Sequence, residues 1–265
     1  MLIDTHCHLD AGEFNADRDT IAKKSLEMGL VAIVVPAIMR GNFDAVIALS
    51  HQHKHCVYAL GIHPMFVNQS NLADIEILNT YVEENNPVAI GEIGLDYYVT
   101  KENHELQTHF FTEQLKLAKH HGLPVLLHSR HAVDDVLKYL RRYQLVGGIA
   151  HAFNGSKQQA EQFIQLGFKL GFGGAMTYTR ALRIRELATT LPLEAIVLET
   201  DSPDIPPEWI GSKGRNTPLE LAKIAQVLAD LRGEKIAQVL DITSANAIKV
   251  MPKLVDLCTP PHPLH

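Results

Sequence analysis

The chain has 265 residues, of which 46% are hydrophobic and 20% charged, and it carries a net charge of −6 at pH 7. This composition excludes an intrinsically disordered chain, and no apolar run approaches the ~18 residues that a transmembrane helix needs. The acidic balance excludes a protein that holds nucleic acid on a broad basic surface. A bound phosphate has to be neutralised locally, by a few arginines or by metal ions.

The amino terminus and the cysteines indicate a cellular compartment. The residues after Met1 form neither a basic region nor an apolar signal segment, so we expect no secretion signal. Three cysteines, at positions 7, 56 and 258, are too few and odd in number for a disulfide framework. We therefore expect a cytoplasmic protein without membrane contact and without an obligatory protein partner.

Short, nearly continuous apolar runs recur along the whole chain. Such runs are typical of strands that are buried on both faces of a parallel sheet. We predict eight strands, at Leu2–Thr5, Val31–Val35, Val57–Leu60, Val88–Gly91, Val125–Leu127, Gly148–Ala150, Phe168–Gly171 and Ala195–Leu198.

Amphipathic helical patterns separate the predicted strands. Apolar side chains recur at three- and four-residue spacing over 133–140, 221–228 and 236–243. Eight strand–helix units at near-even spacing predict an α/β fold of the (β/α)8 TIM-barrel type, in preference to an open doubly wound sheet. We expect a single barrel domain over residues 1–257 and a loose tail over 258–265.

Polar residues with metal-ligand chemistry end five of the predicted strands. His6 and His8 are two residues apart, and residues at that spacing on a strand point to the same face. The other candidates are Glu92, His128, His151 and Asp201. Each alone has an ordinary explanation as a salt bridge, a core histidine or a helix cap. In a barrel, however, all six lie at the carboxyl ends of the strands, where barrel active sites are found, and the combination predicts a metal site.

Six ligands favour two ions that share one carboxylate. The expected sets are His6, His8 and Asp201 for one ion and His128 and His151 for the other, with Glu92 as the bridge. Nitrogen and carboxylate ligands without thiolate suit Zn²⁺, Mn²⁺ or Fe²⁺, and Mg²⁺ also stays open. Two divalent ions lower the pKa of a bound water and stabilise attacking and leaving oxygens. This predicts hydrolysis, with Asp201 and Glu92 as catalytic residues.

Further polar residues surround the predicted metals. His63 follows the third strand, Arg130 lies two residues beyond His128, and Arg215 lies in the Gly- and Pro-rich stretch 203–218. We expect His63, Arg130 and Arg215 to bind substrate, because arginine recognises phosphate through two parallel hydrogen bonds. The alternatives are that His63 packs under Pro64 and that the two arginines form salt bridges at the rim.

Several motifs resemble those of one known family. They are Asp4-Thr5-His6-Cys7-His8-Leu9, Gly91-Glu92-Ile93-Gly94-Leu95-Asp96-Tyr97, the strand ends at His128 and His151, Glu199-Thr200-Asp201-Ser202-Pro203 and Arg215-Asn216-x-Pro218. In this order, from residue 1 to about 250, they resemble the TatD family of metal-dependent hydrolases. The resemblance implies a TIM barrel, two divalent cations held by the six residues above, and deoxyribonuclease activity.

Two enzymatic functions follow from these patterns. The leading expectation is a phosphodiesterase that acts on DNA through a metal-activated water. The alternative is hydrolysis of a small amide, ester or phosphoester on the same centre, including an aminoacyl ester on RNA. A path for DNA needs basic or stacking residues that lead away from the metals, which distinguishes the two. A metal-stabilised scaffold without activity is a third class.

Overall fold

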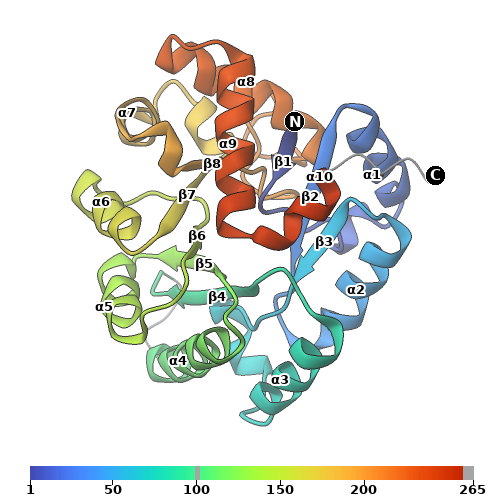
Figure 1. Ribbon diagram of the computed structural model, residues 1–265, viewed down its shortest axis with the longest axis vertical. Coiled ribbons are helices and arrows are strands. Elements are labelled where there is room, and N and C mark those ends of the chain that lie inside the picture. Colours follow the sequence, from blue (N-terminus) through green and yellow to red (C-terminus); the bar gives the residue numbers. More distant parts are fainter. Residues whose placement is uncertain (99–101, 259–265) are drawn as a thin grey trace, which may run out of the picture.

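Eight parallel strands form a closed ring that helices surround (Figure 1). The computed structural model describes residues 1–98 and 102–258. The strands in these ranges are β1 (Leu2–Asp4), β2 (Leu30–Pro36), β3 (Cys56–Ala59), β4 (Ile90–Asp96), β5 (Val125–Arg130), β6 (Gly148–Ala150), β7 (Phe168–Phe172) and β8 (Ile196–Leu198). Each of the eight predicted strands is present, with ends that shift by a few residues.

Backbone hydrogen bonds close the ring. Strands β1–β3 pair in parallel, and β4–β8 form a second parallel run. The two runs meet at both ends. The amide of Leu60 donates to the carbonyl of Ala89 at 3.3 Å between β3 and β4, and the amide of Thr5 donates to the carbonyl of Leu198 at 3.1 Å between β1 and β8. The fold is therefore a (β/α)8 barrel, as the eight-unit pattern predicted.

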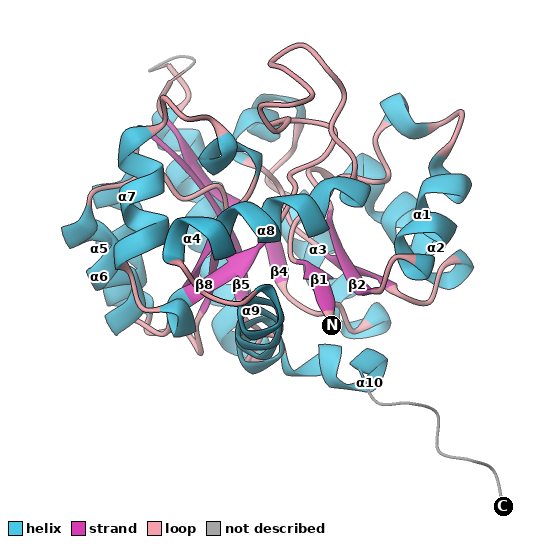
Figure 2. Cartoon of the chain, turned by 90° about the horizontal axis from the view of Figure 1, so that it is seen from above, coloured by secondary structure: helices cyan, strands magenta, loops and turns pink. Residues whose placement is uncertain are grey.

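Helices cover the outside of the barrel (Figure 2). They are α1 (Arg18–Glu27), α2 (Phe43–Gln52), α3 (Asp74–Asn85), α4 (His104–His121), α5 (Val133–Tyr143), α6 (Lys157–Gln165), α7 (Leu182–Thr190), α8 (Leu221–Arg232), α9 (Ile236–Val250) and α10 (Val255–Cys258). None of the helices in the described ranges is long and apolar enough to cross a membrane.

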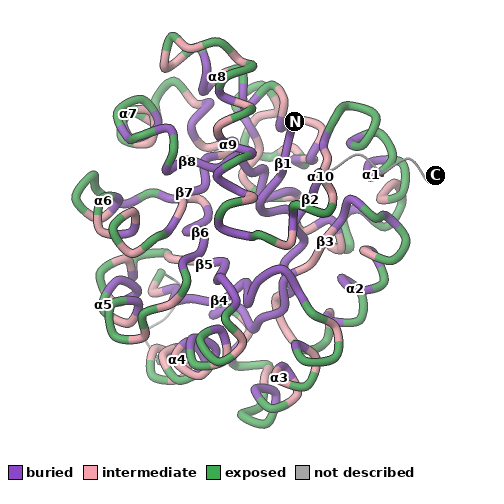
Figure 3. Tube along the Cα trace, viewed as in Figure 1, coloured by how far each residue is buried: buried purple, intermediate pink, exposed green. Residues whose placement is uncertain are grey.

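The strands separate two hydrophobic cores. Alternate strand residues point to opposite faces, so Val125 and Leu127 pack toward the helices while Leu126 points into the barrel. The inner core continues to Val250 and Met251 at the end of α9. Helix α9 lies across the amino ends of the strands and closes that end of the barrel (Figure 2). Buried segments follow the ring of strands (Figure 3). The carboxyl ends are thus the end that is open to a ligand.

Two strands run three residues or more past their predicted carboxyl ends. β4 continues through Glu92 to Asp96, and β5 continues through His128 to Arg130. The prediction ended each strand at its first polar residue, but β-pairing continues through these residues, with Gly94 opposite His128. Glu92 and His128 therefore lie within strands rather than on loops. The single-domain boundary stays a prediction, and tail residues 259–265 lie outside the described residues.

Candidate metal centre

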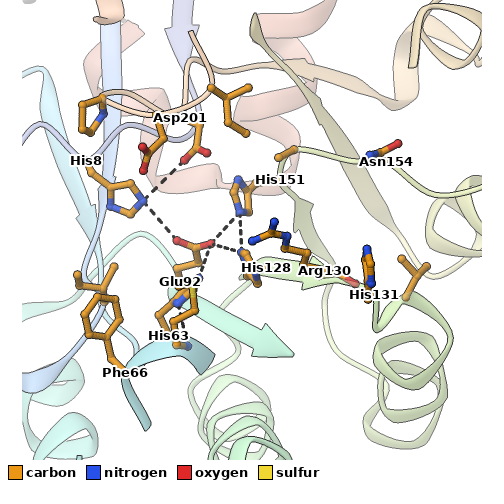
Figure 4. A pocket seen from close by; sticks show the side chains of 18 of the residues that line it. His8, His63, Phe66, Glu92, His128, Arg130, His131, His151, Asn154 and Asp201 are labelled. Carbon is orange, nitrogen blue, oxygen red and sulfur yellow. Dashed lines mark hydrogen bonds and ion pairs between the residues drawn. The ribbon is translucent and has the colours of Figure 1, made fainter. Parts of the chain in front are cut away.

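The six predicted ligands converge at the carboxyl ends of the strands (Figure 4). They are His6 and His8 after β1, Glu92 on β4, His128 on β5, His151 after β6 and Asp201 after β8. Glu92 lies at the middle of the group and is buried. Parallel strands in a closed barrel bring these residues together although up to 195 positions separate them along the chain.

His6, His8 and Asp201 form the first group of facing ligand atoms. The Nε2 atoms of His6 and His8 are 3.3 Å apart, and Asp201 Oδ1 lies 3.6 Å from the first and 3.7 Å from the second. Ligands bound tetrahedrally at about 2.1 Å from an ion are separated by roughly 3.4 Å, so these three atoms fit a single ion. Asp201 adopts a left-handed backbone conformation with φ 56°, which is uncommon for a residue with a side chain.

Glu92 divides its two carboxylate oxygens between two groups. Oε2 lies 3.1 Å from His6 Nε2 and 3.4 Å from His8 Nε2. Oε1 lies 3.2 Å from His128 Nδ1 and 2.7 Å from His151 Nε2, and these two nitrogens are 3.4 Å apart. The second group has the spacing of ligands around another ion. A carboxylate in this position is able to bridge two cations.

Hydrogen bonds define which ring nitrogen each histidine presents. His128 Nε2 lies 3.0 Å from Asp96 Oδ2 and donates its hydrogen bond to that carboxylate. The other ring nitrogen, Nδ1, therefore presents a lone pair to the centre. His63 Nδ1 accepts the amide proton of Met65 at 3.1 Å, so its proton is on Nε2. That nitrogen lies 3.3 Å from Glu92 Oε1, without the geometry of a hydrogen bond. In this tautomer His63 presents a hydrogen-bond donor to the centre rather than a lone pair, although it lies in a group with Glu92 and His128 that could hold an ion.

The charges of the cluster favour bound cations. Burial raises the pKa of Glu92, but His151, His63 and His6 outweigh burial and hold this pKa well below its usual range. Burial opposes a charge on His8 and His151, yet the carboxylate of Glu92 raises their pKa values to about 9 and about 10. Buried carboxylates thus draw positive charge to the centre, and metal ions supply that charge when they replace the protons.

Supporting carboxylates at the centre were missed by the sequence reasoning. Asp96 orients His128, as described above. The Glu199 carboxylate accepts the Ala152 amide at 2.5 Å and is buried, which raises the pKa of Glu199 to about 8. Gly171 makes room for Glu199, because a Cβ at that position would come within 2.0 Å of Oε2. The sequence held a signal for both Asp96 and Glu199. Each stands at the end of an apolar strand, where a carboxylate needs a partner.

A third missed carboxylate, Asp4, joins the two strands that close the barrel. Asp4 Oδ2 accepts the Thr200 hydroxyl at 2.7 Å, and Oδ1 accepts the amide of the same residue at 3.0 Å. Asp4 Oδ1 also accepts the His6 amide at 3.3 Å. Asp4 therefore positions the segments that carry His6 and Asp201.

Two of the three predicted substrate-binding residues line the pocket, and the third does not. His63 and Arg130 line the pocket above the centre, which has a volume of about 1200 Å³. Arg215 is not among the lining residues. Its guanidinium holds Asp17 with bonds of 2.6 and 3.0 Å and the Glu13 carbonyl at 2.6 Å. The two-pronged fork expected for phosphate is thus occupied by a carboxylate, and Arg215 joins the loop after β8 to the segment that precedes α1.

Comparisons with known proteins identify the family of the chain. The family described as TatD related DNase matches residues 3–252. Metal-dependent hydrolase YjjV of Escherichia coli K12 is 41% identical over 245 residues, covering 90% of this chain and 94% of that protein. Human deoxyribonuclease TATDN3 is 32% identical over 266 residues, covering 96% of this chain and 95% of its own length. The crystal structure of YjjV superposes with a TM-score of 0.91 at 38% identity, over 95% of this chain and 98% of that one.

The barrel and its cluster of histidines and carboxylates define a metal-dependent hydrolase. Within that class, the chain belongs to the TatD family.

Proposed function

We propose that the protein hydrolyses phosphodiester bonds of DNA at a centre of two divalent cations. The observation that carries the proposal is the division of the Glu92 oxygens between the His6–His8 side and the His128–His151 side. Bound there, two divalent ions supply Lewis acidity and a lowered pKa for water. The names of the family and of human TATDN3 support DNA as the substrate.

The ligand atoms form one set for each of the two proposed ions. His6, His8 and Asp201 would hold the first ion, His128 and His151 would hold the second, and Glu92 lies where its two oxygens could serve both. Donor atoms that are all nitrogen or carboxylate oxygen suit Zn²⁺, Mn²⁺ or Fe²⁺, and Mg²⁺ is a further candidate. Cys7 is buried and does not belong to any of the ligand groups in the described ranges.

The chain's own residues bind the phosphate and move the proton. His63 Nε2–H and the guanidinium of Arg130 line the pocket and donate hydrogen bonds to the non-bridging phosphate oxygens. The Asp201 carboxylate orients the attacking water and accepts its proton as the water oxygen bonds to phosphorus. The bond from phosphorus to the sugar oxygen of the leaving strand breaks, and this proton passes to the leaving oxygen.

A substrate screen tests this function. Purified protein is stripped with chelator, reloaded separately with Zn²⁺, Mn²⁺, Fe²⁺ or Mg²⁺, and assayed on single-stranded DNA, RNA, small phosphoesters, amides and an aminoacyl ester. Glu92→Gln, reloaded in the same way, is the matched control. We expect DNA cleavage that chelator abolishes and that Glu92→Gln lacks. Preferred turnover of a small ester or amide would replace this proposal with the alternative function.

A further inference from the structure

The rim of the pocket carries opposite charges on two arcs. Arg130 ends β5 and Arg183 lies on α7, so the basic arc follows strands β5–β7. Asp10 and Glu13 follow β1 and Asp204 follows β8, and these two strands are neighbours in the ring. An anionic chain that extends from the metal centre is attracted along the first arc and repelled from the second.

Both arginines of the basic arc keep their charge available. Arg130 lies over the ring of Tyr98, with its Cζ 3.7 Å from the ring centroid. Arg183 donates from Nη2 to Asn154 Oδ1 at 2.7 Å. Within the described ranges neither forms an ion pair at 4.0 Å or less, whereas Arg215 holds a carboxylate. Both side chains are exposed and face the pocket, so an anion is able to reach them.

Asn154 orients Arg183 without neutralising it. The amide oxygen accepts one N–H and carries no charge, so the guanidinium keeps its charge and most of its donors. Asn154 follows β6 and also lines the pocket. In Figure 4 it lies farther from Glu92 than Arg130 does. The Asn154–Arg183 pair thus places a positive charge on the pocket wall, farther from Glu92 than Arg130.

We propose that Arg183, oriented by Asn154, binds the phosphate next to the cleaved one in a strand of DNA, while Arg130 and His63 bind the cleaved phosphate. The inference rests on the proposed phosphodiesterase function and adds its substrate class, a chain with at least two phosphates. The pocket of about 1200 Å³ exceeds the roughly 300–1,000 Å³ of small-molecule sites and has room for such a chain.

The test compares Arg183→Gln with Arg180→Gln as the matched control. Arg180 lies three residues earlier, is exposed and does not line the pocket. The first substrate is a single-stranded DNA tetranucleotide whose cleaved bond is mapped by its products. Two analogues carry one neutral methylphosphonate, on the 5′ or the 3′ side of that bond. The last substrate, bis(p-nitrophenyl) phosphate, has a single phosphate.

We expect Arg183→Gln to lower kcat/KM on the tetranucleotide by about 5-fold, the effect of one exposed ion pair, and to leave the single-phosphate diester unchanged. One methylphosphonate analogue should lower kcat/KM of the wild type and of Arg180→Gln by a similar factor and have no further effect on Arg183→Gln. The salt slope of oligonucleotide binding should become shallower by about 0.7 in Arg183→Gln.

The outcomes separate this inference from the proposed function. Cleavage of the tetranucleotide with equal kcat/KM for Arg183→Gln and Arg180→Gln would overturn the role of Arg183 and leave the phosphodiesterase intact. The role of Arg183 would also be overturned if both methylphosphonate analogues lowered kcat/KM equally in the wild type and in the two variants. A wild type that cleaves neither DNA nor the single-phosphate diester, with any of the metals, would overturn the function itself.

Discussion

At the scale of single residues, the position of Glu92 decides the chemistry of the centre. Its two oxygens face different pairs of histidines, and no other carboxylate in the described ranges lies within 4.0 Å of histidines on both sides. His8, by contrast, belongs to one ligand group only. This asymmetry makes the two residues unequal in function.

We therefore expect Glu92→Ala to lose far more activity than His8→Ala. In the proposed centre, loss of the Glu92 carboxylate removes a ligand of both ions, whereas loss of His8 removes a ligand of one. We expect kcat to fall by more than about 100-fold in Glu92→Ala, with reduced content of both metals. Turnover assays with parallel elemental analysis measure both quantities. Near-normal turnover in Glu92→Ala would instead favour a centre with one ion.

Asp96 acts on the centre through His128. The carboxylate holds Nε2–H at 3.0 Å and thereby directs Nδ1 to the ligand position. Asp96→Asn replaces the charged acceptor by a neutral amide, and we expect metal affinity to fall by about 10- to 100-fold. Competition with a fluorescent chelator measures the affinity, and circular dichroism confirms the fold. An unchanged affinity would show that the orientation of His128 does not depend on this carboxylate.

Stability should depend on pH through His55, which is far from the centre in the fold. Burial lowers the pKa of His55, and Ser25 Oγ lies 3.2 Å from its Nε2. Above the ordinary pKa of about 6.5 both folded and unfolded His55 are neutral. As the pH falls through about 6.5, the unfolded chain takes up the proton more readily, so the free energy of unfolding decreases.

Urea unfolding of wild type and His55→Gln at several pH values, with the same metal present, tests this linkage. We expect the free energy of unfolding to fall more steeply in the wild type than in the variant between about pH 7 and about pH 5. Parallel curves for the two proteins would rule out His55 as the source of the pH dependence.

At the scale of elements, the strands were predictable and some of their side-chain contacts were not. Apolar runs such as Gly148–Ala150 identify buried strands from local sequence alone, and the barrel then brings the polar strand ends together. The contact of Asp96 with His128 depends on the register of β4 against β5, which local patterns do not contain. Arg215 lies in a stretch without helical or strand periodicity, so its partner Asp17 could not be inferred.

Helix α9 offers a test of stability that is separate from catalysis. Asn246 Nδ2 donates to the carbonyls of Leu193 at 2.8 Å and Ile196 at 2.7 Å and joins α9 to the start of β8. We expect Asn246→Ala to lower the free energy of unfolding by about 1–3 kcal/mol, because buried carbonyls lose their donor. The exposed bond of Gln226 with Asp230 on α8 is the control, and Gln226→Ala should change stability by less than about 0.5 kcal/mol.

Equilibrium urea unfolding measures both variants, with kcat/KM recorded on the same samples. The closed amino end of the barrel is opposite the metal centre, so kcat/KM of folded Asn246→Ala should match the wild type. A loss of turnover without loss of stability would contradict the separation of the two ends.

At the scale of the whole molecule, the barrel separates stability from chemistry. The amino ends of the strands pack against α9, and the carboxyl ends carry the buried charges of the centre. The net charge of −6 leaves little long-range attraction for nucleic acid. We therefore expect substrate binding to depend on the metal ions and on a few local arginines, and Arg130 and Arg183 line the pocket.

A metal titration tests the central claim, a centre of two ions bridged by Glu92, most directly. Divalent ions are added stepwise to chelator-stripped protein while bound metal per chain and DNA hydrolysis are measured on the same sample. We predict that hydrolysis appears only as the second equivalent binds, and that Glu92→Gln binds less than two equivalents and stays inactive. Full activity at one equivalent, or activity of the stripped protein, would contradict the account.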